Sequence, residues 1–513
     1  MRQAFLSIGV AAIAAVSTFP LSCGSSPSTG GPSNGPDATT SDVTSPDVSA
    51  SDATGGDTGG DACAGTLCAG VCVDTLTDRK NCGKCGQACL GQDACSGGSC
   101  TSTCTAPATD CSGNCVNTSS DPADCGGCGK ACATGQVCAA SACQMPGAVV
   151  YSVPKVASNG APALDAQGNI YTVGIDGFVR EIDPTGKVGW TSTTSVGVGH
   201  SNYYAWGGVA LGSAQLYVGG PDGELYAFDM TGKFLWKAVV GGDMTFSTPA
   251  VGGASLGGAI VASGGNGTPA VVAVDPSGTT KWSYALGGTT YASSPAIAQD
   301  GTTYVATWSD GNLYAIDTTG ALRWKSSNGG GAVTSASLGH DGTIYVGNHA
   351  PSDGLFRAFK PDGTVKWQYM VGNFHGGAAL DSEDTVYIGN DTMLVALTLQ
   401  GVLKWQVSAG TLPIVNSGEH WVCGNNAVGD DSLVYVPVCG SDSLSVFDPA
   451  QGKLLYEVQL DGFPGPVAVG DHGLLYVGTT AGTFYALAVS AHGLDATSSW
   501  PKHHRDSGNT GQE

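Results

Sequence analysis

The chain has 513 residues, of which 12% are charged, and 20 Lys and Arg stand against 42 Asp and Glu, giving a formal net charge of −22 at pH 7. This excess of negative charge argues against nucleic-acid binding and against electrostatic adhesion to an anionic membrane surface. Glycine is abundant, at 80 residues, and 16 of the 19 cysteines fall between positions 63 and 143.

The N-terminus has the order of a secretory signal: one Arg, an apolar run, then small residues before Cys23. The apolar run is too short for a comfortable membrane span. A cysteine after Ser22 resembles the cleavage site of bacterial lipoproteins, although Pro20 stands where that family usually has Leu. We expect residues 1–22 to be a lipoprotein-type signal peptide, with Cys23 lipidated; signal cleavage without a lipid is the alternative.

Residues 23–62 are almost entirely small, polar or acidic. Aspartates recur every five residues with no Lys or Arg to balance them, at Asp37, Asp42, Asp47, Asp52 and Asp57. Low hydrophobicity with uniform negative charge predicts a disordered acidic linker. Such a linker would hold the folded parts away from a membrane.

The sixteen clustered cysteines form two sets of eight, predicting one cysteine-rich repeat over 63–103 and a second over 104–146. Seven of the eight equivalent positions are 43 residues apart. The cysteines are Cys63, Cys68, Cys72, Cys82, Cys85, Cys89, Cys95 and Cys100, then Cys104, Cys111, Cys115, Cys125, Cys128, Cys132, Cys138 and Cys143. Eight cysteines suit internal pairing, and the spacing leaves all 105 connectivities open.

Disulfides are the interpretation favoured for these repeats, because export places them in an oxidising compartment. Residues 20–150 contain no Phe, Tyr or Trp, so this segment needs covalent links to offset its chain entropy. Zinc is the alternative, since Cys82-x-x-Cys85 and Cys125-x-x-Cys128 have ligand spacing. No His precedes His200, which weighs against zinc. The NCGKCG and DCGGCG cores resemble the stigma-specific-protein-like repeat, which implies an extracellular cysteine-rich fold.

From residue 147 onward the chain repeats every 38–51 residues, most clearly over 293–325. That copy has four short apolar runs separated by Asp-Gly or Thr-Gly turns, which close hairpins. Four antiparallel strands per unit without helical periodicity predict an all-β fold, a β-propeller over 147–489.

A fourth-strand aromatic gives the blade count. It occurs at Trp190, Trp236, Trp282, Trp324, Trp367, Trp405 and Tyr456. The last copy, 463–489, lacks a fourth strand. Residues 147–156 resemble a fourth strand that has no blade of its own, with Tyr151 in the aromatic position. We therefore predict eight blades, the N-terminal strand completing the last and joining the ends of the ring.

The recurring aromatic residues and the Asp residues of the turns are interpreted as packing and turn-capping residues rather than sugar ligands. The units resemble the pyrroloquinoline-quinone-type propeller repeat and, equally, the propeller of the outer-membrane barrel-assembly lipoprotein. That resemblance implies the fold. It does not imply a function, because the repeat occurs in both quinone dehydrogenases and non-catalytic scaffolds.

Quinone catalysis is the less favoured of these two functions. Dehydrogenases of this type usually stack the cofactor on a disulfide between adjacent cysteines, and this chain has no Cys-Cys pair. The propeller cysteines, Cys423 and Cys439, are expected to form a structural disulfide. We expect no catalytic residue, no metal and no cofactor, with a quinone-dependent dehydrogenase as the alternative.

Partner binding is assigned to two long connections between blades, 192–208 and 411–431. They carry the aromatic and His residues Tyr203, Tyr204, Trp206, His420 and Trp421. Exposed aromatics near a channel mouth suit a protein or glycan partner, while packing within the blades is the alternative. The protein is expected to be a monomeric outer-membrane lipoprotein, periplasmic or surface-facing, or else secreted.

Residues 490–513 are expected to form a solvated polar tail. The adjacent His503 and His504 could bind a metal, but exposure to solvent is the favoured interpretation. The ending SWPKHHRDSGNTG resembles the W-P-x-x-x-x-D-x-x-x-T-G segment that often flanks this propeller repeat.

Overall fold

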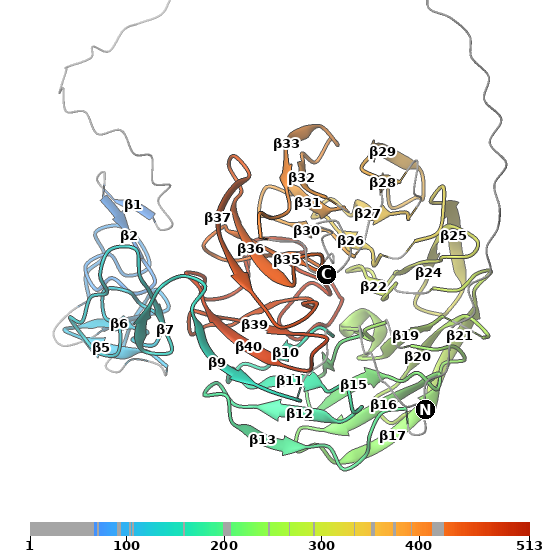
Figure 1. Ribbon diagram of the computed structural model, residues 1–513, viewed down its shortest axis with the longest axis horizontal. Coiled ribbons are helices and arrows are strands. Elements are labelled where there is room, and N and C mark those ends of the chain that lie inside the picture. The colour runs from blue at the N-terminus through green and yellow to red at the C-terminus, as the bar shows by residue number, and fades with distance from the viewer. Residues whose placement is uncertain are drawn as a thin grey trace, which may run out of the picture. The chain divides into compact units, whose positions relative to one another are not determined.

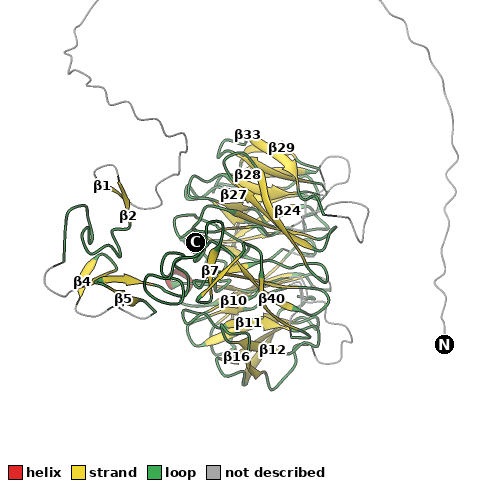
Figure 2. Cartoon of the chain, turned by 60° about the vertical axis from the view of Figure 1, so that its left-hand side comes forward, coloured by secondary structure: helices red, strands yellow, loops and turns green. Residues whose placement is uncertain are grey.

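The computed structural model describes residues 66–68, 71–89, 94–101, 104, 107–156, 160–197, 207–244, 247–265, 267–290, 293–332, 334–349, 354–372, 376–390, 392–412 and 425–513. All of them belong to one compact unit, Ala62–Glu513. The only helix in these ranges is the 3-10 turn η1 (Ala254–Leu256), and strands make up the rest of the regular structure (Figure 2). No helix of the described part is long and apolar enough to cross a membrane. Cys23, Cys63 and Cys423 lie outside it.

Each cysteine-rich repeat consists of two short hairpins. The first repeat has β1 (Thr66–Cys68), β2 (Val71–Val73), β3 (Ala94–Ser96) and β4 (Ser99–Thr101); the second has β5 (Thr109–Cys111), β6 (Asn114–Val116), β7 (Val137–Ala139) and β8 (Ala142–Gln144). Strand β3 pairs in parallel with β6 at Cys95 and Asn114, so one four-stranded sheet, β4-β3-β6-β5, joins the two repeats.

Seven disulfides link fourteen of the sixteen cysteines of the repeats; Cys63 and the side chain of Cys72 lie outside the described part. They are Cys68–Cys85, Cys82–Cys95 and Cys89–Cys100, then Cys104–Cys115, Cys111–Cys128, Cys125–Cys138 and Cys132–Cys143. The three bonds of the first repeat recur in the second at the 43-residue offset, and the prediction of a disulfide-rich region is confirmed. Two cysteine triplets have sulfur atoms within 4.8 Å of one another, but every one of these sulfurs is used in a disulfide, so zinc ligation is not favoured.

Eight four-stranded antiparallel sheets follow, and Figure 1 shows them as the blades of a ring. The innermost, first strands are β10 (Ala163–Leu164), β14 (Ala210–Leu211), β18 (Ala250–Val251), β22 (Ala296–Ile297), β26 (Ser337–Leu338), β30 (Ala379–Leu380), β34 (Ala427–Val428) and β38 (Ala468–Val469). The second strands are β11 (Ile170–Val173), β15 (Gln215–Gly219), β19 (Ile260–Gly264), β23 (Thr303–Ala306), β27 (Ile344–Gly347), β31 (Val386–Gly389), β35 (Val434–Val438) and β39 (Leu474–Gly478).

The third and fourth strands lie farther from the centre. The third strands are β12 (Val179–Ile182), β16 (Glu224–Asp229), β20 (Ala270–Val274), β24 (Asn312–Ile316), β28 (Leu355–Phe359), β32 (Met393–Leu397), β36 (Ser443–Asp448) and β40 (Phe484–Ala488). The fourth strands are β13 (Val188–Thr191), β17 (Phe234–Val239), β21 (Thr280–Ala285), β25 (Leu322–Ser327), β29 (Val365–Met370), β33 (Leu403–Ser408), β37 (Lys453–Gln459) and β9 (Val149–Val153).

The eighth blade closes the ring as predicted. Its fourth strand is the N-terminal β9, which pairs antiparallel with β40 and places Tyr151 opposite Ala486. This pairing covers the outer edge of β40, which would otherwise be unpaired. The predicted all-β, eight-bladed propeller is therefore confirmed.

Neighbouring blades are held together by the fourth-strand aromatic and a glycine of the next blade. A Cβ added at Gly363 would lie 2.6 Å from Trp324 Cδ2, and Gly363 itself has φ +85°. The Trp324 indole N–H donates to the Pro361 carbonyl oxygen of the same turn, at 2.9 Å. The same contact closes the ring, where Tyr151 packs on Gly186 of the first blade. The recurring aromatics thus act in packing between blades.

The second cysteine-rich repeat contacts the turn between β38 and β39. Ser119 Oγ and His472 Nδ1 are 2.8 Å apart, and the Ala140 N–H donates to the His472 carbonyl oxygen at 3.0 Å. A Cβ on Gly473 would lie 2.2 Å from the Cys138 oxygen, so only glycine fits there. Ala139 is fully buried in the hydrophobic core of the eighth and first blades.

Candidate functional site at the central channel

The first strands surround the centre of the ring, which we call the channel, and each of its two ends we call a mouth. We call the side on which each fourth strand leads to the next blade the crossover face. The opposite side, which carries the turns between first and second strands, is the turn face. In antiparallel blades the turns between second and third strands also lie on the crossover face.

Hydrogen bonds join four pairs of neighbouring blades near the crossover face. In each pair, the residue two positions before the first strand donates its N–H to the side-chain oxygen of the equivalent residue in the next blade. The bonds run from Gly208 to Thr248 (2.8 Å), Thr248 to Ser294 (2.9 Å), Ser294 to Ser335 (3.0 Å) and Gly377 to Asn425 (3.0 Å). These bonded residues are small and uncharged, which suits close approach of the blades.

On the turn face the channel is closed by residues 494–513, which we call the closing segment. Backbone N–H groups at the ends of six first strands donate to its carbonyl oxygens at 2.7–2.9 Å. The pairs are Leu164 with Ser507, Leu211 with Gly508, Val251 with Thr510, Ile297 with Gly511, Leu380 with Trp500 and Val428 with Pro501. Figure 1 accordingly shows the C-terminus at the centre of the ring.

The side chains of the closing segment fill the centre of the ring. Asn509 is fully buried, and its Nδ2 lies 2.8–3.3 Å from the carbonyl oxygens of Ala161, Pro162 and Val209. Lys502 is also fully buried, and its ammonium group donates to the carbonyl oxygens of His503 and Asp506 and to Asn509 Oδ1. The segment therefore joins several blades from within.

The expectation of a solvated tail is wrong. His503 and His504 are 7% and 1% exposed, and Trp500 is 2% exposed. The physical reason is that six inner strands present free N–H donors at one mouth, and a polar segment can satisfy them while filling the space. Neither a polar sequence nor adjacent histidines reveal such an arrangement.

Burial sets the protonation states at the centre. It lowers the pKa of Lys502 to about 7, with the Asp506 carboxylate acting in the opposite direction. It lowers the pKa of His504 to about 3, and the charge of Lys502 adds to this effect. The pKa of His503 is likewise held well below its usual value by burial and by the adjacent His504 and Lys502. Both imidazoles are neutral at pH 7.

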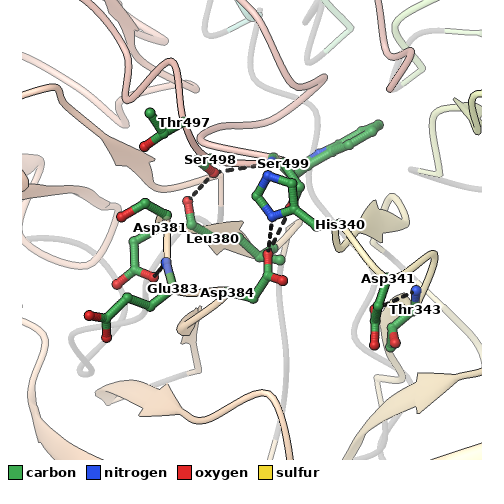
Figure 3. A network of polar contacts seen from close by, with 12 residues as sticks. His340, Asp341, Thr343, Leu380, Asp381, Glu383, Asp384, Thr497, Ser498 and Ser499 are labelled. Carbon is green, nitrogen blue, oxygen red and sulfur yellow. Dashed lines mark hydrogen bonds and ion pairs between the residues drawn. The ribbon is translucent and has the colours of Figure 1, made fainter.

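A polar network of Ser, His and Asp residues links the closing segment to the fifth and sixth blades (Figure 3). Ser499 Oγ donates to Asp384 Oδ1 at 3.0 Å, and His340 Nδ1 lies 3.0 Å from the same oxygen. In a catalytic triad the His stands between the Ser and the Asp; here Asp384 stands between Ser499 and His340. The network attaches the segment to the turn 381–385 and does not activate a nucleophile.

The predicted partner-binding residues Tyr203, Tyr204, Trp206, His420 and Trp421 lie outside the described residues, and their role stays a prediction. The structure shows another aromatic on the crossover face, in the turn between β23 and β24. Trp308 is 37% exposed there, with its ring 5.4 Å from that of His349. Cys439 is fully buried and disulfide-bonded.

The described residues do not fit a quinone cofactor at the crossover mouth. The ring there offers hydroxyl, amide and backbone groups without charge. Carboxylates of adjoining turns accept hydrogen bonds within their own blades: Tyr226 donates to Asp222, and Tyr314 donates to Asp310, both at 2.5 Å. We therefore derive no reaction step through a quinone.

Two family models match the chain. Residues 175–327 and 267–491 match the family described as outer membrane protein assembly factor BamB, and together they cover more than half of the chain. The chain belongs to this family. Residues 92–146 match the stigma-specific STIG1-like protein family, which confirms the resemblance of the cysteine-rich repeats.

A curated relative of this BamB-family chain is the uncharacterized protein YxaL of Bacillus subtilis (strain 168). It is 39% identical over 72 residues, which are 13% of this chain and 15% of that protein. Because the matched part is far below two thirds of the relative, the match carries no statement about the whole protein.

Solved structures are similar to the propeller part of the chain. The C-terminal WD40 domain of Sif2 matches 67% of this chain and 98% of its own length, at 12% identity and a TM-score of 0.53. BamB from Moraxella catarrhalis matches 66% of this chain and 99% of its own, at 16% identity and a TM-score of 0.49. Quinohemoprotein alcohol dehydrogenase from Comamonas testosteroni matches 67% and 76%, at 15% identity and 0.47. At these identities the likeness concerns the fold alone, and no functional argument rests on it.

Proposed function

We propose that this BamB-family protein is exported, anchored by a lipid on Cys23, and binds a protein or glycan partner without catalysing a reaction. The observation that carries the proposal is the centre of the channel. Lys502 and Asn509 there donate hydrogen bonds to backbone and side-chain oxygens of the protein itself. The polar groups at the centre thus serve the ring, which leaves recognition to surface loops on a rigid scaffold.

Export is supported by the cysteine-rich repeats. Their disulfides are of the kind that persists in the envelope or outside the cell. With a lipid on Cys23, the acidic residues 23–62 would serve as the tether between the membrane and these repeats, and like charges along it would keep it extended.

The crossover face is the face we assign to the partner. On the turn face, the closing segment occupies the centre and the second cysteine-rich repeat contacts the turn at His472. The crossover face carries the exposed Trp308, and the aromatic connections 192–208 and 411–431 lead into first strands from that side. Aromatic side chains supply large contact area for both protein and glycan partners.

The anchor is tested by Cys23→Ser in the full-length protein, expressed in a Gram-negative host. We expect the wild type in the membrane fraction with a fatty-acid mass increment on its N-terminal peptide. The variant should be soluble and unlipidated. A wild-type protein cleaved elsewhere and released without lipid would refute the anchor and leave the secreted alternative.

The binding face is tested by capture from a cell-envelope extract. The triple variant Tyr203→Ala, Tyr204→Ala and Trp206→Ala, and separately Trp308→Ala, should lose a retained protein or glycan. The matched control is Met370→Ala, because this fourth-strand residue is 67% exposed and lies away from the channel. Equal capture by all variants would refute the crossover face as the binding surface.

Absence of catalysis is tested with pyrroloquinoline quinone and Ca²⁺ added to the full-length protein. Equilibrium dialysis should give no stoichiometric binding, and alcohols or aldose sugars should not reduce a dye. Stoichiometric binding with turnover would overturn the proposal and establish a quinone dehydrogenase.

A further inference from the structure

Three consecutive basic residues, Lys502, His503 and His504, are buried at the centre of the closed channel. The lysine has three oxygen partners, but the two imidazoles each keep one nitrogen without a hydrogen-bond partner: Nδ1 of His503 and Nε2 of His504. The other nitrogen of His504, Nδ1, lies 3.2 Å from the Asn509 carbonyl oxygen. Unpaired buried polar atoms are uncommon in native proteins and call for an explanation.

Protonation of either imidazole would create a charge that this site cannot satisfy. The new N–H would have no acceptor, and the imidazolium would stand beside the Lys502 ammonium. The two rings are themselves only 4.9 Å apart, between centroids. A buried, unpaired charge costs far more than a neutral imidazole in the same place.

The surroundings supply no compensating charge. A Cβ built on Gly377 would lie 3.8 Å from His503 Nδ1, 3.5 Å from Asn425 Oδ1 and 3.7 Å from the Ser335 carbonyl oxygen, so the blade groups on this side of His503 are neutral. Within the closing segment, the Asp506 carboxylate accepts from the N–H and the hydroxyl of Thr510.

Arg505 follows His504 directly, and its guanidinium group lies 3.7 Å from the Asp506 carboxylate. Further titratable groups flank the segment. Asp384 of the sixth blade bonds to Ser499 and His340, at the edge of the channel. Burial raises the pKa of Glu513. Glu513 therefore favours the docked segment as pH falls, opposite to the imidazoles.

We propose that the closing segment is an acid-released plug of the channel, held in place by neutral His503 and His504 and expelled when they take up protons. Release opens the channel at the turn face. It also frees the six backbone N–H donors at the ends of the first strands, which form a track for an extended peptide.

The direction of the pH effect follows from proton linkage. A released imidazole has the ordinary pKa of about 6.5, whereas the docked one stays neutral, so falling pH favours release. Between pH 7.0 and 5.5 each imidazole should raise the ratio of released to docked segment about 8-fold, and both together about 70-fold. Lys502 adds only about 2-fold in this window, because with a docked pKa of about 7 it is already half protonated at pH 7.0.

The test is hydrogen–deuterium exchange of the full-length protein at pH 7.0 and 5.5, corrected for the intrinsic rates. Amides such as Arg505, Asn509 and Gly511, which donate within the closing segment, should exchange faster at pH 5.5, while those of the outer strands stay unchanged. The double variant His503→Gln with His504→Gln should lose the pH dependence. The control His492→Gln, at an exposed residue near the segment, should keep it.

Two outcomes would overturn the proposal: equal protection of the wild-type segment at both pH values, or acid release that persists in the double variant. If the double variant fails to dock at pH 7.0, the wild type still decides. NMR of ¹³C-labelled histidine should then show both imidazoles neutral while the segment is docked, and an ordinary pKa near 6.5 for either one in that state would overturn the proposal.

Discussion

The cysteine-rich repeats and the propeller solve the same problem, the entropy of a long chain, by different physical means. In the first repeat the core is a cluster of Cys82, Cys89 and Cys95, so the covalent links are also the buried apolar groups. The propeller buries Tyr, Phe, Leu, Ile and Val in every blade and joins its ends by strand pairing of β9 with β40. A segment that is poor in large apolar side chains needs covalent links to stay folded. A segment in which every blade carries large apolar side chains does not need them.

The largest effect should come from reduction of the disulfides. Each bond in the repeats closes a loop of 11–17 residues and contributes about 3 kcal/mol. We expect reductant under native conditions to abolish exchange protection over 66–144 while the blades stay protected. Protection that survives reduction would show that the small core suffices. Cys439→Ser serves as the control for the disulfide inside the propeller.

The next effect concerns the closing segment, which attaches to the ring without a covalent bond. Trp500 is buried in the core shared by the fourth, fifth and sixth blades. Trp500→Ala should cost about 3–5 kcal/mol of docking free energy. Exchange protection should be lost over the closing segment and kept in the second strands. An unchanged segment in this variant would mean that its backbone hydrogen bonds alone hold it.

Two glycines with similar backbone angles compare the regions directly. Gly363 of the propeller (φ +85°) meets Trp324 of the neighbouring blade, whereas Gly129 of the second repeat (φ +74°) has nothing within 4 Å of an added Cβ. Gly129→Ala should cost about 1 kcal/mol of stability from backbone strain alone. Gly363→Ala should cost about 3 kcal/mol, because overpacking is added. Denaturant unfolding measures both, and equal costs would contradict the packing role of the glycine.

The internal repetition after residue 147 predicted most of the propeller, because each blade carries the same pattern of aromatic residues and turn residues. The positions of the fourth-strand Trp residues predicted the number of blades. Tyr151, in a strand without a blade of its own, predicted how the ring closes. The disulfide connectivity could not be predicted, since spacing does not say which of eight sulfurs meet in space. The 43-residue offset only implied that the two repeats would pair alike.

The burial of the closing segment could not be predicted for a different reason. Lys502 and Asn509 are buried by partners that lie up to 348 residues away, such as Ala161, whose oxygen lies near Asn509 Nδ2. No local sequence pattern indicates that a polar residue will be buried by contacts from six blades. The W-P and T-G pairs near the C-terminus were the sequence feature that could have indicated burial of this segment, because Trp500 is the residue that the core encloses.

The smallest effect concerns turn capping in each region. In the propeller, Asp317 Oδ1 accepts from the N–H and the hydroxyl of Thr319 and from the Ala321 N–H, and the Thr319 hydroxyl is the main cause that lowers the pKa of Asp317. In the second repeat, Asp124 Oδ1 accepts from the Gly129 N–H at 2.6 Å, in a turn already fixed by Cys125 and Cys128.

Asp317→Asn should therefore lower the melting temperature slightly at pH 7, and Asp124→Asn should leave it unchanged, because the disulfides already constrain that turn. A carboxylate whose pKa is lowered in the folded state stabilises fully above its unfolded pKa of about 3.9. That contribution is lost as pH falls through the lower folded value. Scanning calorimetry from pH 7 to pH 2.5 should show the Asp317→Asn difference shrinking only at the acid end. A difference that is constant over this range would mean that the carboxylate charge plays no part in the cap.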